Sequence, residues 1–288
     1  MLSLDQVHTI AVCGAGTMGA GIAQVAAISG YNTVLFDIQP GMLDKARARI
    51  AQGVDTAVAK GRLTDAERTS ALQRIRFTTQ VHDCIAEVII EAIAEQVPAK
   101  TGLFNQLAEI NHSETIFATN TSSLPVSRIA EKVVNPSRVA GMHFFNPAPV
   151  MKLVEVVTAR DTHPLVATLV YELAVSMGKT PVHVKDAPGF IVNRVARHYY
   201  LEAMKAAEQG VADFATIDRL LEGTGFRMGP FALMDLIGND VNLAVTRSLY
   251  EAAGHAPRFA PNPLQVAKVE QGQLGRKSGQ GFYHYTER

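Results

Sequence analysis

The 288-residue chain has few of the features that mark secreted, metal-binding or nucleic-acid-binding proteins. Its only two cysteines, Cys13 and Cys84, both lie in apolar, strand-like segments. This excludes a disulfide framework and a cysteine-based zinc site, and it indicates reduced thiols. Lys plus Arg and Asp plus Glu each number 27, and the resulting zero net charge argues against binding to nucleic acid or to an anionic membrane. The sequence therefore predicts a cytoplasmic protein without a bound metal.

The apolar stretch at residues 10–30 is not expected to be a signal peptide or a membrane span. No basic region precedes it, and glycines interrupt it. The chain also has no internal repeat and no low-complexity segment. Its composition is therefore typical of an ordinary soluble enzyme.

A glycine-rich turn near the N-terminus predicts a dinucleotide-binding site. Gly14-Ala-Gly16-Thr-Met-Gly19 follows an apolar run that predicts a buried strand, and residues 17–29 predict a helix. The pyrophosphate of a dinucleotide rests on helix N–H groups at such a turn. We expect Gly14 to permit the tight turn and Gly16 to let the backbone approach the phosphates. Gly19 is expected to let the helix pack close to the sheet.

Asp37 stands at the end of the next predicted strand, residues 31–36. A carboxylate at this position can accept both hydroxyls of an adenosine ribose, and it would repel a 2′-phosphate. No Arg or Lys follows within the next several residues. The sequence therefore predicts NAD, rather than NADP, as the cofactor.

The rest of the chain divides into two halves of different pattern. Through about residue 185, short strand-like runs alternate with helical stretches, which predicts a parallel sheet covered on both faces. The expected strands are residues 10–13, 33–36, 88–92, 115–119 and 139–144, and the expected helices are residues 42–60, 65–74 and 98–109. After Asp186–Gly189 the pattern is helical, with expected helices at residues 190–209, 216–224 and 233–253. We predict a Rossmann-type α/β domain over residues 1–187 and an all-helical C-terminal domain over residues 188–288.

Polar side chains that can carry chemistry follow two of the predicted strands. Residues 118–124 and 141–149 both fall at carboxyl ends of strands, the edge at which open α/β sheets bind ligands. His143 lies at one of these ends, and Glu155 follows twelve residues later on a strand with strictly alternating polarity. A strand–loop–strand of this length can bring the Glu155 carboxylate beside the His143 ring, although Glu155 at an exposed edge is an equally good interpretation. Such a pair would orient the imidazole for proton transfer.

These motifs resemble those of the short-chain L-3-hydroxyacyl-CoA dehydrogenases, close to the bacterial 3-hydroxybutyryl-CoA dehydrogenases. The resemblance covers nearly the whole chain. It includes residues 14–24, 91–95, 120–124, 143–147, 151–156, 188–194, 228–230 and 275–283. It implies NAD-dependent interconversion of (S)-3-hydroxyacyl-CoA and 3-oxoacyl-CoA, as in fatty-acid β-oxidation, and a homodimer formed through the C-terminal domain.

The resemblance also implies a role for individual residues. His143 would be the general base and Glu155 its orienting partner. Ser122 and Asn193 would hydrogen-bond the reacting oxygen or nearby catalytic groups, and Asn146 would help to hold the substrate. The implied cofactor-binding residues are Gly14, Gly16, Thr17, Met18, Gly19, Asp37, Glu95, Lys100, Asn120, Ser122 and Asn146. The implied substrate-binding residues are Ser122, His143, Asn146, Asn193 and Lys60.

One segment departs from the family pattern. Family members often carry Ser and Lys in the helix after the second strand, where the coenzyme A moiety is held. Here Gly53 and Thr56 occupy two such places and Lys60 is retained. The dehydrogenase interpretation is unaffected, but the geometry of coenzyme A binding is left open.

Other functions remain as alternatives. The acyl tail can carry a second carboxylate, as in 3-hydroxyadipyl-CoA. A dehydrogenase of free β-hydroxyacids would share the fold, but such enzymes usually rely on a lysine base, and the His143–Glu155 pair argues against one. A non-catalytic, crystallin-like NAD-binding protein would have lost catalytic residues that this chain keeps.

The predicted helices of the C-terminal half hold more apolar positions than three helices can bury among themselves, which also favours a homodimer.

Overall fold

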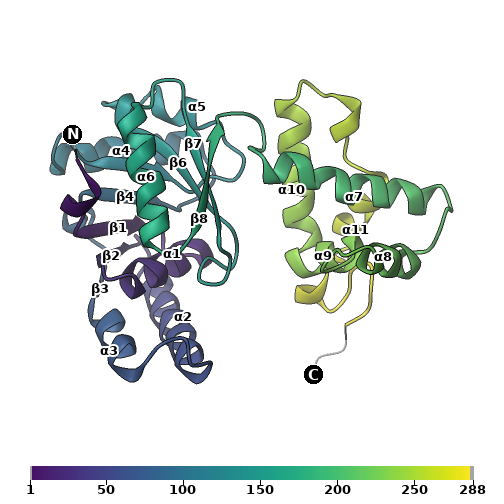
Figure 1. The fold of residues 1–288 in the computed structure, drawn as a ribbon. Helices are drawn as coiled ribbons and strands as arrows, with labels where there is room; N and C mark the ends of the chain where they lie inside the picture. The colour runs from purple at the N-terminus through teal and green to yellow at the C-terminus, as the bar shows by residue number, and fades with distance from the viewer. Residues whose placement is uncertain (1, 286–288) are drawn as a thin grey trace. The chain divides into compact units, whose positions relative to one another are not determined.

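The computed structural model describes residues 2–285, and contacts divide the chain into two compact units, Met1–Ala187 and Pro188–Arg288 (Figure 1). We call them the sheet unit and the helical unit. No helix among the described residues is both long enough and apolar enough to cross a lipid bilayer.

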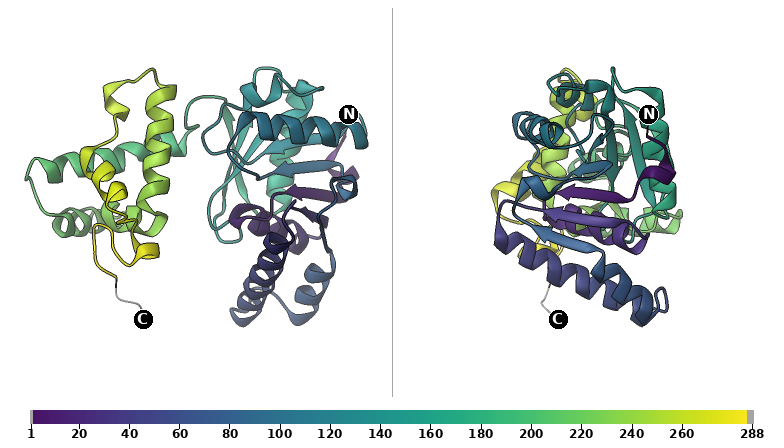
Figure 2. Two further views of the ribbon diagram at one scale, coloured as in Figure 1. Left: turned by 180° about the vertical axis from the view of Figure 1, so that it is seen from behind. Right: turned by 90° about the vertical axis from the view of Figure 1, so that its left-hand side faces the viewer.

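The sheet unit is built on one eight-stranded sheet with the strand order β3-β2-β1-β4-β5-β6-β7-β8 (Figure 2). Its strands are β1 (Thr9–Cys13), β2 (Asn32–Phe36), β3 (Ile75–Thr78), β4 (Val88–Glu91), β5 (Ile116–Thr119), β6 (Val139–Phe144), β7 (Leu153–Thr158) and β8 (Thr180–Lys185). Its helices are α1 (Thr17–Ile28), α2 (Pro40–Ala59), α3 (Asp65–Gln73), α4 (Val97–Ile110), α5 (Val126–Ala130) and α6 (Pro164–Ser176). The first six strands follow the Rossmann order, in which ligands bind where the strand order reverses, here between β1 and β4.

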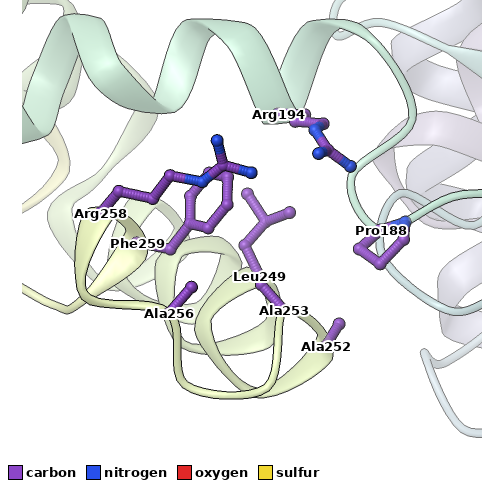
Figure 3. Close-up of a pocket in the computed structure, with 8 residues that line it drawn as sticks. All are labelled: Pro188, Arg194, Leu249, Ala252, Ala253, Ala256, Arg258 and Phe259. Atoms are coloured by element: carbon purple, nitrogen blue, oxygen red, sulfur yellow. The ribbon is translucent and has the colours of Figure 1, made fainter.

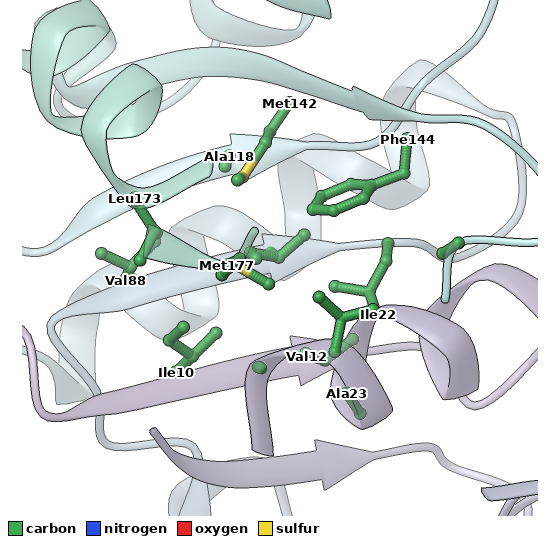
Figure 4. Close-up of a cluster of buried hydrophobic side chains, with 14 of the residues drawn as sticks. Ile10, Val12, Ile22, Ala23, Val88, Ala118, Met142, Phe144, Leu173 and Met177 are labelled. Atoms are coloured by element: carbon green, nitrogen blue, oxygen red, sulfur yellow. The ribbon is translucent and has the colours of Figure 1, made fainter. Parts of the chain in front are cut away.

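Helices cover both faces of this sheet. On one face, side chains of α1 and α6 pack on alternate strand residues to form a core that includes Val12, Ile22, Met142 and Leu173 (Figure 4). On the other face, α4 packs Phe104 against Phe117 of β5 with ring centroids 5.2 Å apart. Because both faces are covered, β1, β4, β5 and β6 are almost entirely buried and read as apolar runs.

Three features of the sheet differ from the sequence-based prediction, and one of them is β8, which was not among the expected strands. Strand β3 was not expected, because Arg76 interrupts its short apolar pattern and only two of its four residues are buried. The sheet is also not entirely parallel, since β7 pairs antiparallel with β6, and β8 then runs parallel to β7. A short loop joins β6 to β7, and strands joined by a short loop pair antiparallel. This pairing places residues of the two strands directly opposite each other.

The helical unit contains α7 (Val192–Glu208), α8 (Phe214–Gly223), α9 (Pro230–Ile237), α10 (Asn239–Ala252) and α11 (Pro263–Glu270). Its core includes Tyr200, Met204, Phe231 and Phe282. The prediction of a single helix over residues 233–253 is wrong: α9 and α10 are separate helices. Gly238 divides them with a φ of +104°, a conformation that residues other than glycine rarely adopt.

Candidate active site

The glycine-rich loop joins β1 to α1 at the carboxyl edge of the sheet. Gly14 has a φ of +103°, and an added Cβ would lie 2.5 Å from the Ala92 carbonyl oxygen. A Cβ on Gly19 would lie 1.7 Å from the Gly14 oxygen, so α1 can approach the loop only with glycine there. A Cβ on Gly16, by contrast, would meet no protein atom within 4 Å. The fold itself thus requires Gly14 and Gly19, whereas Gly16 borders open space that suits an approaching diphosphate.

Asp37 lies directly beside this loop at the end of β2. Its Oδ2 accepts a hydrogen bond from the Ala15 N–H at 2.8 Å, and its Oδ1 accepts one from the Gln39 N–H at 2.9 Å. These bonds fix a half-buried carboxylate next to the glycine-rich turn, as expected for a group that binds a ribose. Thr17, the first residue of α1, accepts a hydrogen bond from Arg49 Nη1 of α2 at 3.1 Å, which adds a cation at the same helix N-terminus.

His143 and Glu155 form a buried pair on β6 and β7. The two residues are direct cross-strand partners in the antiparallel ladder, so their side chains lie on the same face. His143 Nδ1 and Glu155 Oε2 are 2.7 Å apart, and the carboxylate is fully buried. The Phe145 ring lies 4.5 Å from the imidazole, between centroids. Glu155 is therefore not an exposed edge residue, and the contact fixes which ring nitrogen faces the carboxylate.

The loop that follows β5 lies between this pair and the end of β4. Asn120 Oδ1 accepts a hydrogen bond from the Phe144 N–H at 2.8 Å, which ties the loop to the strand that bears His143. Glu95 Oε1 accepts hydrogen bonds from the N–H groups of Ser122 and Ser123 at 3.0 and 3.3 Å. Asn120, Ser122, His143 and Glu95 thus belong to one connected set of groups at the carboxyl edge of the sheet.

Lys100 lies beneath that loop and is almost completely buried. Its ammonium contacts Glu91 Oε1 at 2.6 Å and Glu95 Oε2 at 3.1 Å. Burial raises the pKa of Glu91, although Lys100 and Thr119 act against it. Burial also raises the pKa of Glu95, but Lys100 and hydrogen bonds from the loop outweigh it, and the net shift is downward. We call Glu91, Glu95 and Lys100 the carboxylate–lysine cluster.

The sequence analysis did not identify Glu91 as a site residue. The sequence shows only an acid at the end of an apolar strand and gives no sign of its partners. Its Oε2 accepts a hydrogen bond from Thr119 Oγ1 at 2.7 Å and its Oε1 accepts one from the Ile93 N–H at 2.7 Å. The available signal was Lys100, nine residues away, since a buried cation is usually paired with an acid.

The remaining predicted residues lie on other elements of the fold. Asn146 is exposed in the loop after β6, where a cis peptide bond joins it to Pro147. Asn193 is half-buried on the first turn of α7 and belongs to the helical unit. Lys60 caps the C-terminus of α2 and is exposed.

Gly53 and Thr56, the positions that depart from the family pattern, both have local structural reasons. An added Cβ on Gly53 would lie 2.5 Å from Gln24 Oε1, so glycine there allows α2 to pack on α1. Thr56 Oγ1 donates a hydrogen bond to the Gln52 carbonyl at 2.8 Å. Neither position holds a charged group that could contact a phosphate.

The strand order, the glycine-rich loop and Asp37 together define a Rossmann-type dinucleotide-binding protein. Comparison with known families agrees with this class. The model described as 3-hydroxyacyl-CoA dehydrogenase, NAD binding domain, matches residues 9–187, and the model for the C-terminal domain of the same enzymes matches residues 189–285. The chain belongs to the 3-hydroxyacyl-CoA dehydrogenase family.

Individual relatives are similar over nearly the whole chain. The 3-hydroxyadipyl-CoA dehydrogenase of Escherichia coli K12 is 48% identical over 97% of this chain, which spans 59% of that relative's length. The probable 3-hydroxybutyryl-CoA dehydrogenase of Deinococcus radiodurans is 42% identical over 95% of this chain and 99% of its own length. A crystal structure of 3-hydroxybutyryl-CoA dehydrogenase from Escherichia coli K12 matches with a TM-score of 0.94 and 47% identity, covering 98% of this chain and 61% of that one.

These findings confirm the predicted family, the predicted fold class of a Rossmann-type domain followed by a helical domain, the enzyme class and the use of NAD. They do not assign roles to individual residues.

Proposed function

We propose that the chain catalyses the NAD-dependent interconversion of (S)-3-hydroxyacyl-CoA and 3-oxoacyl-CoA with short acyl chains, with 3-hydroxybutyryl-CoA and acetoacetyl-CoA as the simplest pair. The observation that carries this proposal is the buried contact of 2.7 Å between His143 and Glu155 at the carboxyl edge of a dinucleotide-binding sheet. A proton acceptor at that edge is what an alcohol needs when it loses a hydride.

His143 acts as the general base in the direction of oxidation. With Nδ1 donating its hydrogen to Glu155, the lone pair of Nε2 is the one that takes the proton of the 3-hydroxyl group. Glu155 stabilises the imidazolium that forms and keeps the ring in one orientation. In the reverse direction, the imidazolium returns the proton to the 3-oxo group.

Ser122 and Asn193 donate hydrogen bonds to the reacting oxygen, which becomes more negative as the carbonyl is reduced. The bond from Ser122 N–H to Glu95 holds the serine in its loop. Asn146 helps to hold the substrate. Asp37 binds the adenosine ribose, and Glu95, Lys100 and Asn120 shape the nicotinamide side of the cofactor site. NAD, when bound there, accepts or donates the hydride.

Coenzyme A requires cations along α2, and Lys60 is the proposed phosphate contact. The substrate tail can also end in a second carboxylate, as in 3-hydroxyadipyl-CoA. This second candidate is supported by the 48% identity to a relative named for that substrate.

We further propose that the protein works in the cytoplasm, where Cys13 and Cys84 stay reduced.

His143→Gln tests the proposed mechanism. It keeps a polar side chain but removes the proton acceptor, so kcat for NADH-dependent reduction of acetoacetyl-CoA should fall about 10²- to 10⁴-fold, with little change in NADH affinity. His82→Gln, on an exposed side chain far along the sequence, is the matched control. Glu155→Gln should also lower kcat, and the two losses should be strongly non-additive, because both act through one imidazole. Near-normal turnover by His143→Gln at saturating substrate would exclude the mechanism.

Asp37→Ser tests the cofactor assignment. The substitution removes the carboxylate that accepts the ribose hydroxyls, so NADH should bind more weakly and the preference for NADH over NADPH should narrow. Binding is measured by the quenching of NADH fluorescence and does not depend on turnover. A wild-type enzyme equally efficient with NADPH would mean that Asp37 does not contact the ribose.

We also propose that the helical unit forms a homodimer. It exposes large apolar side chains, including Val195, Val211, Leu220 and Phe226, each more than half exposed. Where exposed apolar side chains of this size gather on one surface, a partner usually covers them. Light scattering at micromolar concentration should give the mass of two chains, and a predominantly monomeric mass would contradict the proposal.

A further inference from the structure

The helical unit contains a pocket that no step of the proposed mechanism uses. It has a volume of about 320 Å³ and lies between the start of α7, the end of α10 and the short helix at Pro257–Phe259 (Figure 3). Its apolar lining consists of Pro188, Leu249, Ala252, Ala253, Ala256 and Phe259. This volume is at the lower end of the range for small-molecule sites, so it suits a short chain rather than a coenzyme.

Two arginines complete the lining of this pocket. Arg194 reaches in from the first turn of α7, and the guanidinium of Arg258 lies over the Phe259 ring, 4.8 Å from its centroid (Figure 3). Both side chains are exposed. Arginine stacked on an aromatic ring by its face keeps the N–H groups at its edge available, and this planar fork matches a carboxylate.

A third arginine lies one helical turn further along the same helices. Arg197 follows Arg194 by three residues on α7, and its Nη1 donates to Thr246 Oγ1 on α10 at 3.0 Å. Thr246 in turn precedes the pocket residue Leu249 by three residues. Residues three apart lie on the same face of a helix. Arg197 therefore contacts α10 one helical turn before Leu249, which lines the pocket.

Arg197 carries its charge into the interior without an acid. It is 3% exposed, its Nη1 contacts only Asn242 and Thr246, and its Nε has no partner. Burial lowers the pKa of Arg197 to about 10, so the group remains charged at neutral pH. Among residues 2–285, no carboxylate forms an ion pair with Arg194, Arg197 or Arg258. An uncompensated buried cation is costly, and an anion in the adjacent pocket would offset that cost.

We propose that this pocket binds a carboxylate at the end of a short aliphatic chain, with the carboxylate on Arg258 and Arg194 and the chain against Leu249 and the alanines. The ligand is either the tail of a dicarboxylyl thioester substrate or a free carboxylic acid. Only the first of these rests on the proposed function.

Arg258→Gln is the test variant, because Arg258 is exposed and its loss should leave folding intact. Arg247→Gln is the control, since Arg247 is an exposed arginine of α10 that does not line the pocket. The first measurement is kcat/KM with NADH for 3-oxoadipyl-CoA and for 3-oxohexanoyl-CoA. Loss of a charge-assisted hydrogen bond should lower the ratio of the two values about tenfold or more, with 3-oxohexanoyl-CoA and acetoacetyl-CoA little affected. Arg258→Lys, which keeps the charge without the planar fork, should retain part of the preference.

The second measurement is calorimetric titration of the NAD-loaded protein with hexanoate and with hexan-1-ol. Hexanoate should bind to the wild type and to Arg247→Gln, more weakly to Arg258→Gln, and the alcohol should bind to none of them detectably. If Arg258→Gln lowers both the kcat/KM ratio and the affinity for hexanoate, the ligand is the substrate tail. If it lowers only the affinity for hexanoate, the ligand is a free acid. An unchanged ratio together with no hexanoate binding would overturn the proposal. Failure to reduce acetoacetyl-CoA would contradict the proposed function, but the titration does not depend on turnover and still tests the pocket.

Discussion

The most deeply buried cation of the sheet unit is Lys100 and that of the helical unit is Arg197, and only Lys100 contacts acids. Lys100 lies between two carboxylates, at 2.6 Å from Glu91 and 3.1 Å from Glu95. Arg197 has only neutral partners and one unsatisfied nitrogen. A buried charge is tolerated only where other charges or hydrogen bonds compensate its desolvation. The carboxylate–lysine cluster is complete in itself. The group formed by Arg197, Asn242 and Thr246, which we call the Arg197 cluster, is completed by a ligand.

The difference also concerns what each cluster holds in place. Glu95 is bound to Lys100 on one side and accepts from the Ser122 N–H on the other, so the cluster fixes the loop beside His143 before any ligand arrives. Fixed donors and acceptors of this kind lower the reorganisation that a reaction requires. Arg197 holds only Asn242 and Thr246, which are buried and have no part in the proposed chemistry.

Lys100→Met should have the largest effect on stability. It leaves Glu91 and Glu95 without their cation, and breaking a buried ion pair typically costs about 3–5 kcal/mol. The free energy of unfolding, from urea titration at pH 7, should fall by this amount, while the exposed control Lys132→Met should change it by less than about 0.5 kcal/mol.

The pH dependence of this variant has a definite sign. Burial already raises the pKa of Glu91, and the loss of Lys100 removes the group that lowers it. A folded-state pKa above the unfolded value means that the native state binds more protons, so stability rises as the pH falls towards the unfolded pKa. The deficit of Lys100→Met should therefore be smaller at pH 5 than at pH 7. An equal deficit at both pH values would mean that Glu91 is not the group left uncompensated.

Arg197→Met should have a smaller effect on stability, because its removal leaves no acid unpaired. Asn242 Oδ1 still accepts from Gln265 Nε2 at 2.6 Å, and the Asn242 carbonyl still accepts from Thr246 Oγ1 at 3.0 Å. Replacing an uncompensated buried ion by an apolar side chain of similar length is often neutral. We expect a change within about 1 kcal/mol in urea unfolding, together with weaker hexanoate binding. If Arg197→Met lowered the free energy of unfolding as much as Lys100→Met does, the Arg197 cluster would stabilise the fold without a ligand as strongly as the carboxylate–lysine cluster does.

The sequence predicted those parts of the molecule that local pattern determines. The glycine-rich turn, Asp37 and the strand that bears His143 lie where they were expected, because each depends on residues next to it in the chain. The contact between His143 and Glu155 could be anticipated as well, since only one short loop separates their strands.

Features that depend on distant packing could not be predicted. The bond between Glu91 and Thr119 joins residues 28 apart, and the bond between Arg197 and Thr246 joins residues 49 apart. The sequence of α7 shows Arg194 and Arg197 only as two charges near the start of a helix, one of which proves to be buried. The break at Gly238 was missed because the apolar pattern continues across it at helical spacing. A Cβ on this glycine would lie 2.9 Å from Asp240 Oδ1 and 3.0 Å from Lys277 Nζ, a contact that the sequence does not show.

Gln265→Glu should have the smallest effect and should sharpen the comparison most, because it gives the Arg197 cluster the acid it lacks. Gln265 is fully buried, its Oε1 has no partner, and its Nε2 shares the acceptor Asn242 Oδ1 with Arg197. The new carboxylate has nearly the same shape, but one of its oxygens replaces the Nε2 that donates to Asn242 Oδ1. Its attraction to Arg197 offsets part of that loss and of its desolvation, so stability should fall by about 1 kcal/mol. Hexanoate affinity should fall several-fold, because the positive charge behind the pocket is now neutralised from within. Gln209→Glu, an equal charge change at the exposed end of α7, should leave the affinity unchanged. If both variants bind hexanoate as the wild type does, Arg197 contributes nothing to the pocket and its buried charge needs another explanation.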